Sequence, residues 1–196
     1  MSTATSVPRR EQLLEAAALL FAERGFHAVG IDDIGAAAGI SGPGVYRHFA
    51  SKQALLEALC DRAMSRMLEG AQDIVAGHAD PQEALEALVD LHVEFAVQER
   101  ALIGVWVRET RALSDDVRRS LRRRMRSYEQ PWHQALGRLR EDLDAADVHV
   151  VTGSTLAMLN GTAFTSPEVE PQQLARLLKR MALAALLSRR VPASRG

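Results

Sequence analysis

The sequence predicts an all-α protein of about nine helices, with an N-terminal three-helix domain followed by a longer helical domain. Alanine and leucine dominate the chain, and both residues favour helices. Apolar residues recur at three- and four-residue steps, as on one face of a helix, and no stretch shows the alternation typical of a strand. Hydrophobic residues make up 47 % of the 196 residues, which is enough for a packed core.

Three helices are expected near the N-terminus. The first spans 9–25 and ends at Gly25, because glycine is favoured just past a helix C-terminus. A second helix over 30–39 is ended by Gly39, and a third follows over 41–48. Two short helices joined by a tight, glycine-containing turn are typical of a helix-turn-helix.

The rest of the chain predicts longer helices. Ser51 can cap the first of them, and Pro81 suits the first turn of the next. Ser114, followed by two aspartates, starts another, because acidic residues are favoured in a first turn. The expected ranges are 52–78, 81–98, 101–112, 114–139, 147–164 and 171–190.

Charge and composition exclude several classes of protein. The net charge of −1 means that any nucleic-acid surface must be a local patch. Cys60 is the only cysteine, which fits a reducing compartment. No signal-peptide pattern is visible, and the longest apolar segment, 148–164, is short and polar for a membrane span. We therefore expect a cytoplasmic protein with no membrane partner.

Motifs of catalysis are also missing. The sequence has no nucleophile elbow, phosphate loop or His-Glu-x-x-His pair. The six histidines show no metal-ligand spacing. We therefore expect no enzyme activity, no catalytic residue, no cofactor and no metal.

Residues 11–60 resemble the DNA-binding domain of the TetR/AcrR family of regulators. The resemblance rests on the stretches LLEAAALLFAERGF, IDDIGAAAGIS and GPGVYRHFASKQALLEAL. It implies a helix-turn-helix DNA-binding domain over 1–52 and an effector-binding and dimerisation domain over 53–196. It also implies a ligand-responsive transcriptional regulator, expected to be a repressor, which binds a palindromic DNA operator as a homodimer. A small, largely hydrophobic effector, for example an acyl-CoA, would release it.

The third expected helix carries the candidate DNA contacts. In a helix-turn-helix, the N-terminal residues of the second helix lie near base edges. Its glycines and proline offer no side-chain donor, so their contribution would be steric, and Arg47 is the best candidate for a guanine contact. The resemblance puts Tyr46, His48 and Lys52 at phosphates. The expected DNA-binding residues are Ser41, Gly42, Pro43, Gly44, Tyr46, Arg47, His48 and Lys52.

The resemblance also implies an effector cavity among the later helices. The candidate contacts are His92, Phe95, Trp106, Tyr128 and Trp132. Large apolar sites with a few polar groups are ordinary ligand pockets. The alternative is that the aromatic residues belong to the core and that His92 is a core histidine bonded to a neighbour.

Two further surfaces carry alternatives. Arg119, Arg122, Arg123 and Arg126 gather on one side of the 114–139 helix, where they form either an anion site for a phosphorylated effector or a solvated charged face. Near the C-terminus, either a second copy or the same chain packs on two sets of residues. These sets are the small residues Gly153, Ala157 and Gly161, and the apolar stripe Leu174, Leu177, Leu178, Met181 and Ala185.

Two other functions fit the same residues. One is a DNA-binding dimer of this fold without an effector. The other is a small-molecule-binding protein whose DNA binding is vestigial. An effector titration that shifts operator affinity distinguishes the first from the regulator, and a selection for bound DNA sequences distinguishes the second.

Overall fold

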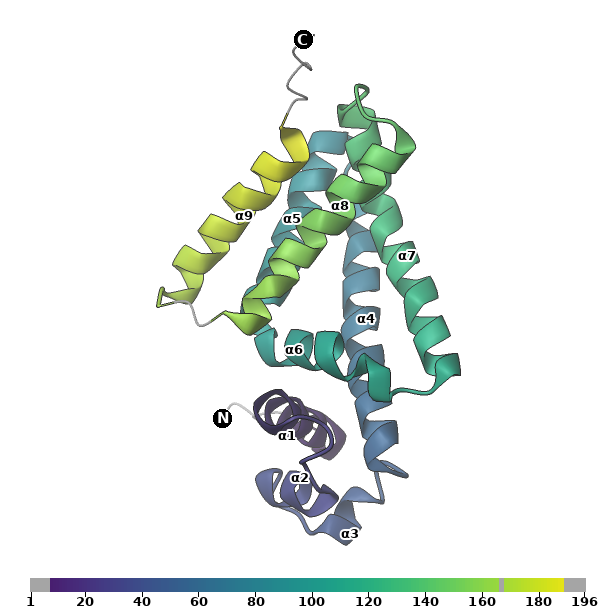
Figure 1. The fold of residues 1–196 in the computed structure, drawn as a ribbon, viewed down its shortest axis with the longest axis vertical. Helices are drawn as coiled ribbons and strands as arrows, with labels where there is room; N and C mark the ends of the chain where they lie inside the picture. The colour runs from purple at the N-terminus through teal and green to yellow at the C-terminus, as the bar shows by residue number, and fades with distance from the viewer. Residues whose placement is uncertain (1–7, 166–167, 189–196) are drawn as a thin grey trace, which may run out of the picture. The chain divides into compact units, whose positions relative to one another are not determined.

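The computed structural model describes residues 8–165 and 168–188. Over these residues the chain forms nine α-helices and two 3-10 turns and no strand, which confirms the all-α prediction (Figure 1). The elements are α1 (Arg9–Arg24), α2 (Ile31–Ala37), α3 (Gly42–Val45), α4 (Lys52–Gly77), α5 (Pro81–Gln98), α6 (Arg100–Glu109), η1 (Thr110–Ala112), α7 (Asp115–Leu139), α8 (Ala145–Asn160), η2 (Gly161–Phe164) and α9 (Pro171–Leu187).

The helices divide into two compact units. The first unit contains Met1–Met64 and Ala101–Arg122, and the second contains Ser65–Arg100 and Arg123–Gly196. The two compact units do not follow the predicted domain boundary, which falls after residue 52. A single cut in the sequence cannot describe this division, because α4 and α7 each contribute residues to both units and most of α6 belongs to the first.

The core of the first unit lies where α1 packs on α2 and α2 on α3. Phe21 of α1 meets Phe26 edge-to-face, with ring centroids 5.2 Å apart, a geometry that aromatic pairs prefer. Apolar residues from α1, α2, α3 and α4 complete this core. They are Leu13, Leu14, Ala17, Ile34, Val45, Leu55, Leu56 and Leu59, all at most 1 % exposed.

The turn between α2 and α3 depends on two glycines. Gly39 has φ +70°, a conformation that side-chain-bearing residues rarely adopt, and it follows the last helical residue of α2, Ala37, and the C-cap Ala38. Gly35 lies where the chain returns toward α3. A Cβ at Gly35 would lie 2.9 Å from the carbonyl oxygen of Ile40 and 3.2 Å from the amide nitrogen of Gly42, so only glycine fits this close approach.

The third helix is shorter than predicted. Helix α3 ends at Val45 rather than His48, and the next residues form a turn. The amides of Arg47 and His48 donate to carbonyls three residues back, at 3.3 and 2.9 Å, as in a turn rather than an α-helix. Two glycines among the four residues of α3 lower its helix propensity, which explains the early end.

The serine before α4 forms a capping hydrogen bond, whereas the serine before α3 does not. Ser51 accepts a hydrogen bond from the amide of Ala54 at 3.0 Å and caps α4 as expected. Ser41 stands at the N-cap position of α3, but its side chain makes no capping hydrogen bond. Helix α8 begins two residues before the prediction, because Asp144 accepts from the amide of Asp147 at 2.8 Å.

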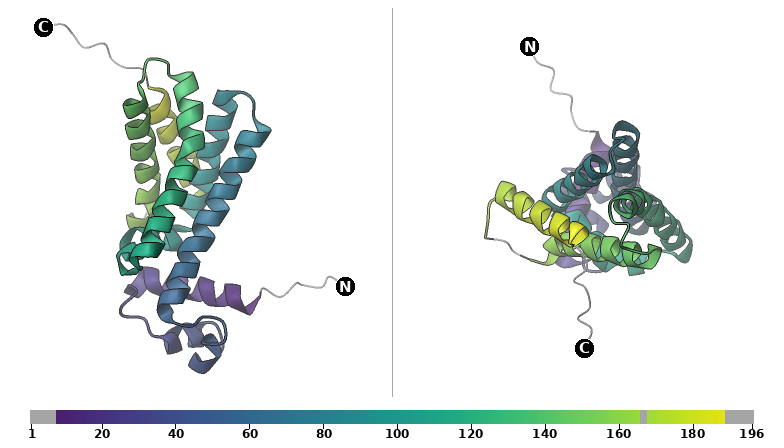
Figure 2. Two further views of the ribbon diagram at one scale, coloured as in Figure 1. Left: turned by 90° about the vertical axis from the view of Figure 1, so that its right-hand side faces the viewer. Right: turned by 90° about the horizontal axis from the view of Figure 1, so that it is seen from above.

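In the second unit, α9 packs along α5 and α8, as Figures 1 and 2 show. Arg140, only 6 % exposed, holds the end of α9. Its guanidinium forms a two-pronged ion pair with Asp142, with both contacts at 2.7 Å, and donates to the carbonyl oxygens of Leu186 and Ser188. Helix α9 ends at Leu187, and the last predicted helical residues, 189–190, lie outside the described residues.

Two further features bear on the expected class of protein. None of the helices in the described ranges is both long and apolar enough to cross a membrane. Cys60 is 1 % exposed in the core of the first unit. Burial, with smaller contributions from Glu57 and Asp61, raises the pKa of its thiol to about 12.

Candidate nucleic-acid interface and effector core

The segment after α3 exposes three of the predicted DNA contacts. Val45 and Phe49 are buried at 0 % and 4 % exposure and anchor this segment to the core. Between them, Tyr46, Arg47 and His48 are all exposed, with Tyr46 56 % accessible. A large aromatic side chain held open to solvent beside two basic or polar ones has the chemistry of a phosphate- and base-contacting surface.

The N-terminal end of α3 is less open than the sequence suggests. Ser41 and Pro43 are exposed, but Gly42 is buried. A Cβ added at Gly42 would collide with Oδ1 of Asp32, so the carboxylate of Asp32 fills the space that a side chain would take. Asp32 is therefore a neighbour of the recognition surface.

Lys52 has a structural role that the sequence did not predict. Its ammonium donates to the carbonyl oxygens of Phe26 and Val29, at 2.8 and 2.7 Å. A longer contact of 3.4 Å reaches the carbonyl oxygen of His27, and the ammonium lies 4.6 Å from the ring centroid of Phe26. An ammonium has only three protons to donate, so Lys52 is fully engaged in holding the α1–α2 connector. Its predicted phosphate contact stays a prediction.

Helix α6 supports the same unit from outside the predicted DNA-binding segment. The carboxylate of Glu109 accepts from the amide of Phe26 at 3.1 Å. The side chain of Gln53 donates to the carbonyl oxygen of Ala112 at 2.8 Å, which ties the start of α4 to η1. No short-range sequence pattern could have indicated these contacts, because they join residues 59 and 83 positions apart.

Three of the predicted effector contacts form a buried cluster in the second unit. His92 bonds through Nδ1 to the Tyr128 hydroxyl at 2.8 Å and through Nε2 to Oδ1 of Asn160 at 3.2 Å. Trp132 meets both His92 and Tyr128, with centroids 6.1 and 6.2 Å apart. These are the neighbours that a core histidine needs, and sequence reasoning missed Asn160.

Burial shifts the pKa values in this cluster. Desolvation lowers the pKa of His92 to about 4, and the hydrogen bond with Asn160 opposes this shift. Desolvation likewise raises the pKa of Tyr128 well above its usual range. His92 is therefore neutral at physiological pH. With Nε2–H donating to Oδ1 of Asn160, Nδ1 accepts a hydrogen bond from the Tyr128 hydroxyl.

The other two predicted effector contacts are placed differently. Phe95 is 9 % exposed in the second unit, whereas Trp106 is half-buried and belongs to the first unit. Two cavities in the second unit, of about 400 and 630 Å³, are lined by other residues. The smaller lies between α5 and α9, and the larger beside the α7–α8 turn. The effector contacts stay predictions.

Most arginines of α7 are exposed, whereas Arg118 and Arg124 are half-buried. Arg119 pairs with Asp116 and Arg118 pairs with Asp115, in each case one turn earlier on the helix. Arg122, Arg123 and Arg126 are open to solvent. Both sequence interpretations of this face, an anion site and a solvated surface, remain open.

Helices α8 and α9 both carry small or apolar residues that are exposed. On α9, the inward residues are Leu178, Ala182 and Leu186, whereas Met181 and Ala185 of the predicted stripe are exposed. A Cβ added at Gly153 of α8 or at Gly161 of η2 would meet nothing within 4 Å. Packing within one chain therefore does not use the small residues of α8. Other exposed apolar side chains of this unit are Val150 and Phe164.

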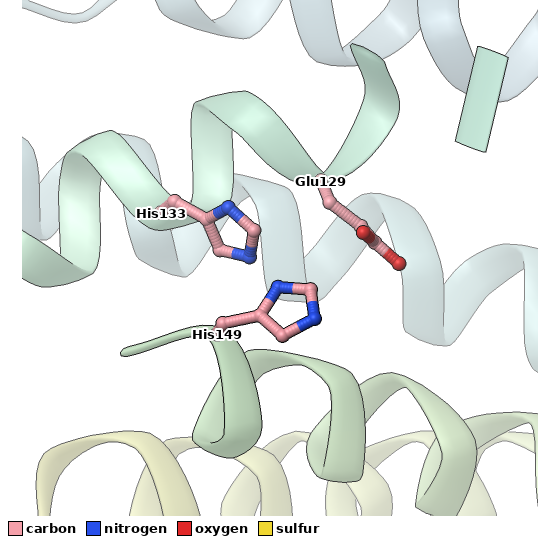
Figure 3. Close-up of side chains that lie close together, drawn as sticks. All are labelled: Glu129, His133 and His149. Atoms are coloured by element: carbon pink, nitrogen blue, oxygen red, sulfur yellow. The ribbon is translucent and has the colours of Figure 1, made fainter. Parts of the chain in front are cut away.

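A cluster of possible metal ligands lies between α7 and α8. Figure 3 shows Glu129 and His133 one turn apart on α7 and His149 on α8, with the two imidazoles close together. Their ligand atoms all lie within 4.8 Å of one another. Burial lowers the pKa of His133, while Glu129 acts in the opposite direction. The spacing of Glu129 and His133 was visible in the sequence, but only the fold brings His149 to them.

Comparison with known families matches most of the chain. Residues 13–59 match the model of bacterial regulatory proteins of the tetR family, and residues 78–186 match that of the tetracyclin repressor-like C-terminal domain. The HTH-type transcriptional repressor KstR2 of Mycobacterium tuberculosis is 31 % identical over 182 residues, which cover 87 % of this chain and 91 % of that protein. The solved structure of this ketosteroid regulator aligns with a TM-score of 0.76 at 27 % identity, covering 93 % and 97 % of the two chains.

Two other relatives match less completely or less closely. The HTH-type transcriptional activator FasR of Mycolicibacterium smegmatis is 38 % identical over 87 residues, and the match spans 44 % of this chain and 40 % of that protein. AibR, solved in complex with isovaleryl coenzyme A and operator DNA, has a TM-score of 0.74 at 22 % identity, covering 89 % and 97 % of the chains. The latter likeness is one of fold.

Proposed function

The chain belongs to the TetR family of bacterial transcriptional regulators, and we propose that it is a homodimeric repressor released from a palindromic operator by a small, largely hydrophobic effector. As a member of this family it is a DNA-binding regulator and not an enzyme. The observation that carries the proposal is the exposed set Tyr46, Arg47 and His48 beside the rigidly held start of α4. The repressor role is supported by the similarity to the repressor KstR2.

In the proposed complex the turn after α3 lies against the major groove. Arg47 bonds to O6 and N7 of a guanine, while Tyr46 and His48 contact phosphates. Pro43 and Gly44 let the backbone approach the bases and contribute through shape, whereas Gly42 leaves room for the carboxylate of Asp32. Lys52 acts mainly by fixing the connector before α2, and any phosphate contact that it makes competes with three carbonyl oxygens.

Dimerisation through α8 and α9 is supported by the small and apolar residues that both helices expose. Small residues spaced by four allow two helices to approach closely, and Met181 and Ala185 supply apolar area beside them. Two copies joined in this way would present their recognition elements about 34–36 Å apart or a little more, as a palindromic site needs. We expect Ala157→Glu to produce a monomer in light scattering, whereas Glu15→Ala on the exposed face of α1 leaves the dimer intact. A wild-type monomer at micromolar concentration would refute the proposal.

The effector proposal must account for a closed core. His92, Tyr128 and Trp132 are at most 5 % exposed, so a ligand that touches them has to enter between packed helices. A ligand shifts the balance between two states only if it binds one of them better. The ligand-bound core would therefore differ from the closed one described above. Short acyl-CoA esters are the first ligands to test, because a neighbour of the same fold binds isovaleryl coenzyme A.

One experiment tests both parts of the proposal. Selection from a random DNA library should yield a palindromic operator, and fluorescence anisotropy should then measure its release by candidate acyl-CoA esters. The same titration should change intrinsic fluorescence, because both tryptophans of the chain are proposed effector contacts. A ligand that releases DNA while Trp106→Phe and Trp132→Phe respond as wild type does would refute the effector site and leave DNA binding standing.

An effector-free regulator is the second candidate. The complete hydrogen bonding of His92 favours it, since both ring nitrogens already have partners within the chain. In that case operator affinity would not change with any acyl-CoA, and no ligand would co-purify with the protein in mass spectrometry.

A further inference from the structure

The α7–α8 cluster combines three side chains from two helices. Glu129 and His133 are four residues apart on α7, a spacing that puts both side chains on one face of a helix. His149 reaches them from α8, and the imidazole centroids of His133 and His149 lie 5.3 Å apart (Figure 3). All three ligand atoms fall within 4.8 Å of one another.

His133 has an unexplained polar atom in this cluster. Its Nε2 is buried and has no hydrogen-bond partner among the described residues. A buried ring nitrogen without a partner costs free energy, and buried polar groups of this kind commonly indicate an absent water or ion. A cation bound here would give this nitrogen a partner, and the carboxylate of Glu129 would offset part of the positive charge.

The donor set fits one class of ion. Two imidazole nitrogens and one carboxylate oxygen form a set that suits zinc and the neighbouring first-row metals. With bonds of 2.0–2.1 Å, ligand atoms around a tetrahedral ion lie about 3.3 Å apart. Side-chain rotation can close the present separations to this value, because Glu129 is long and His149 is exposed. The fourth coordination position of the ion would be open to water, on the exposed side near His149.

We propose that Glu129, His133 and His149 bind one divalent transition-metal ion, with zinc the best fit, and that this ion fastens α7 to α8. The site lies within the second unit and is separate from the recognition surface of α3. An ion that binds the folded chain and not the unfolded one stabilises the fold by mass action.

Calorimetric titration of the untagged, chelator-stripped full-length protein with zinc chloride tests the site. We expect one ion per protomer and a rise in melting temperature of about 5–10 °C at a hundredfold excess over Kd. His133→Gln and His149→Gln should each weaken binding at least about tenfold and, at the same zinc concentration, reduce the thermal shift to about half or less. His27→Gln, which removes an exposed imidazole of the other unit, should bind as wild type does.

The exposed His149 keeps the test decisive even if His133→Gln does not fold. His149→Gln changes a solvent-facing side chain, and circular dichroism should match the wild type. Two results would overturn the proposal: no heat of binding at about 100 μM zinc, or equal affinity in the wild type and in folded His149→Gln.

Discussion

Replacing Lys52 by methionine separates the structural role of this residue from its predicted contact with DNA. Methionine keeps most of the side-chain length and removes the ammonium. If Lys52 holds the connector between α1 and α2, the substitution leaves the carbonyl oxygens of Phe26 and Val29 without their donor. Both contacts are partly buried, so water replaces them incompletely.

The size of the effect follows from these contacts. Hydrogen bonds to charged groups contribute about 1.5–3 kcal/mol each, and the ammonium over the ring of Phe26 adds about 0.5–1 kcal/mol. Because the side chain of Lys52 is only half-buried, water recovers part of this energy. We therefore expect Lys52→Met to lower the free energy of unfolding by about 2–4 kcal/mol and the melting temperature by about 5–15 °C.

Urea unfolding without DNA is the deciding assay, with Arg47→Met as the matched control. Arg47 is an exposed cation five residues earlier, so Arg47→Met should unfold as wild type does. Lys52→Arg keeps the charge but has a planar head that does not suit three converging carbonyls, and it should also be destabilised. Unchanged urea midpoints for both Lys52 variants would refute the structural role. The predicted contact with a DNA phosphate would then be the remaining role of Lys52.

Three further predictions concern other residues. Gly35→Ala should lower the free energy of unfolding by about 1–3 kcal/mol, because its Cβ meets backbone, whereas Gly137→Ala at an open helical position should raise it by about 0.5–1 kcal/mol in the same urea assay. The pKa of His92 is about 4 in the fold against an ordinary 6.5, so the unfolded chain binds the proton more tightly and stability falls as pH drops below 6.5. Between pH 7 and 4.5 the wild type should lose about 2 kcal/mol more than His92→Gln, and equal losses would contradict this assignment. Arg47→Ala should weaken operator binding by about 1–3 kcal/mol at particular base pairs in anisotropy measurements, whereas Tyr46→Ala should weaken operator and random DNA alike; an equal loss on both DNAs for Arg47→Ala would remove its base-reading role.

Local features of the chain were predictable from sequence, and contacts between distant segments were not. The end of α1 at Gly25 and the cap of α4 at Ser51 depend on neighbouring residues, so their patterns are visible in a short window. The length of α3 was overpredicted, because two glycines weaken this four-residue helix.

The candidate sites divide in the same way. Tyr46, Arg47 and His48 were predictable because the recognition motif is a continuous stretch of sequence. The second role of Lys52 was not, since its acceptors lie 23 to 26 residues away on a connector whose path follows from the packing of α1. Likewise Asn160 approaches His92 only through the packing of α8 on α5, across 68 residues.

Cys60 determines how this protein can be labelled. Thiol-reactive probes attack the thiolate, and a buried thiol with a pKa of about 12 has almost none at neutral pH. The native cysteine therefore stays silent toward maleimides while the protein is folded. A cysteine introduced on an exposed face, for example in place of Glu15, would carry the only dye of the protomer. Fluorescence studies of the recognition surface therefore need one introduced cysteine, and Cys60 does not have to be replaced.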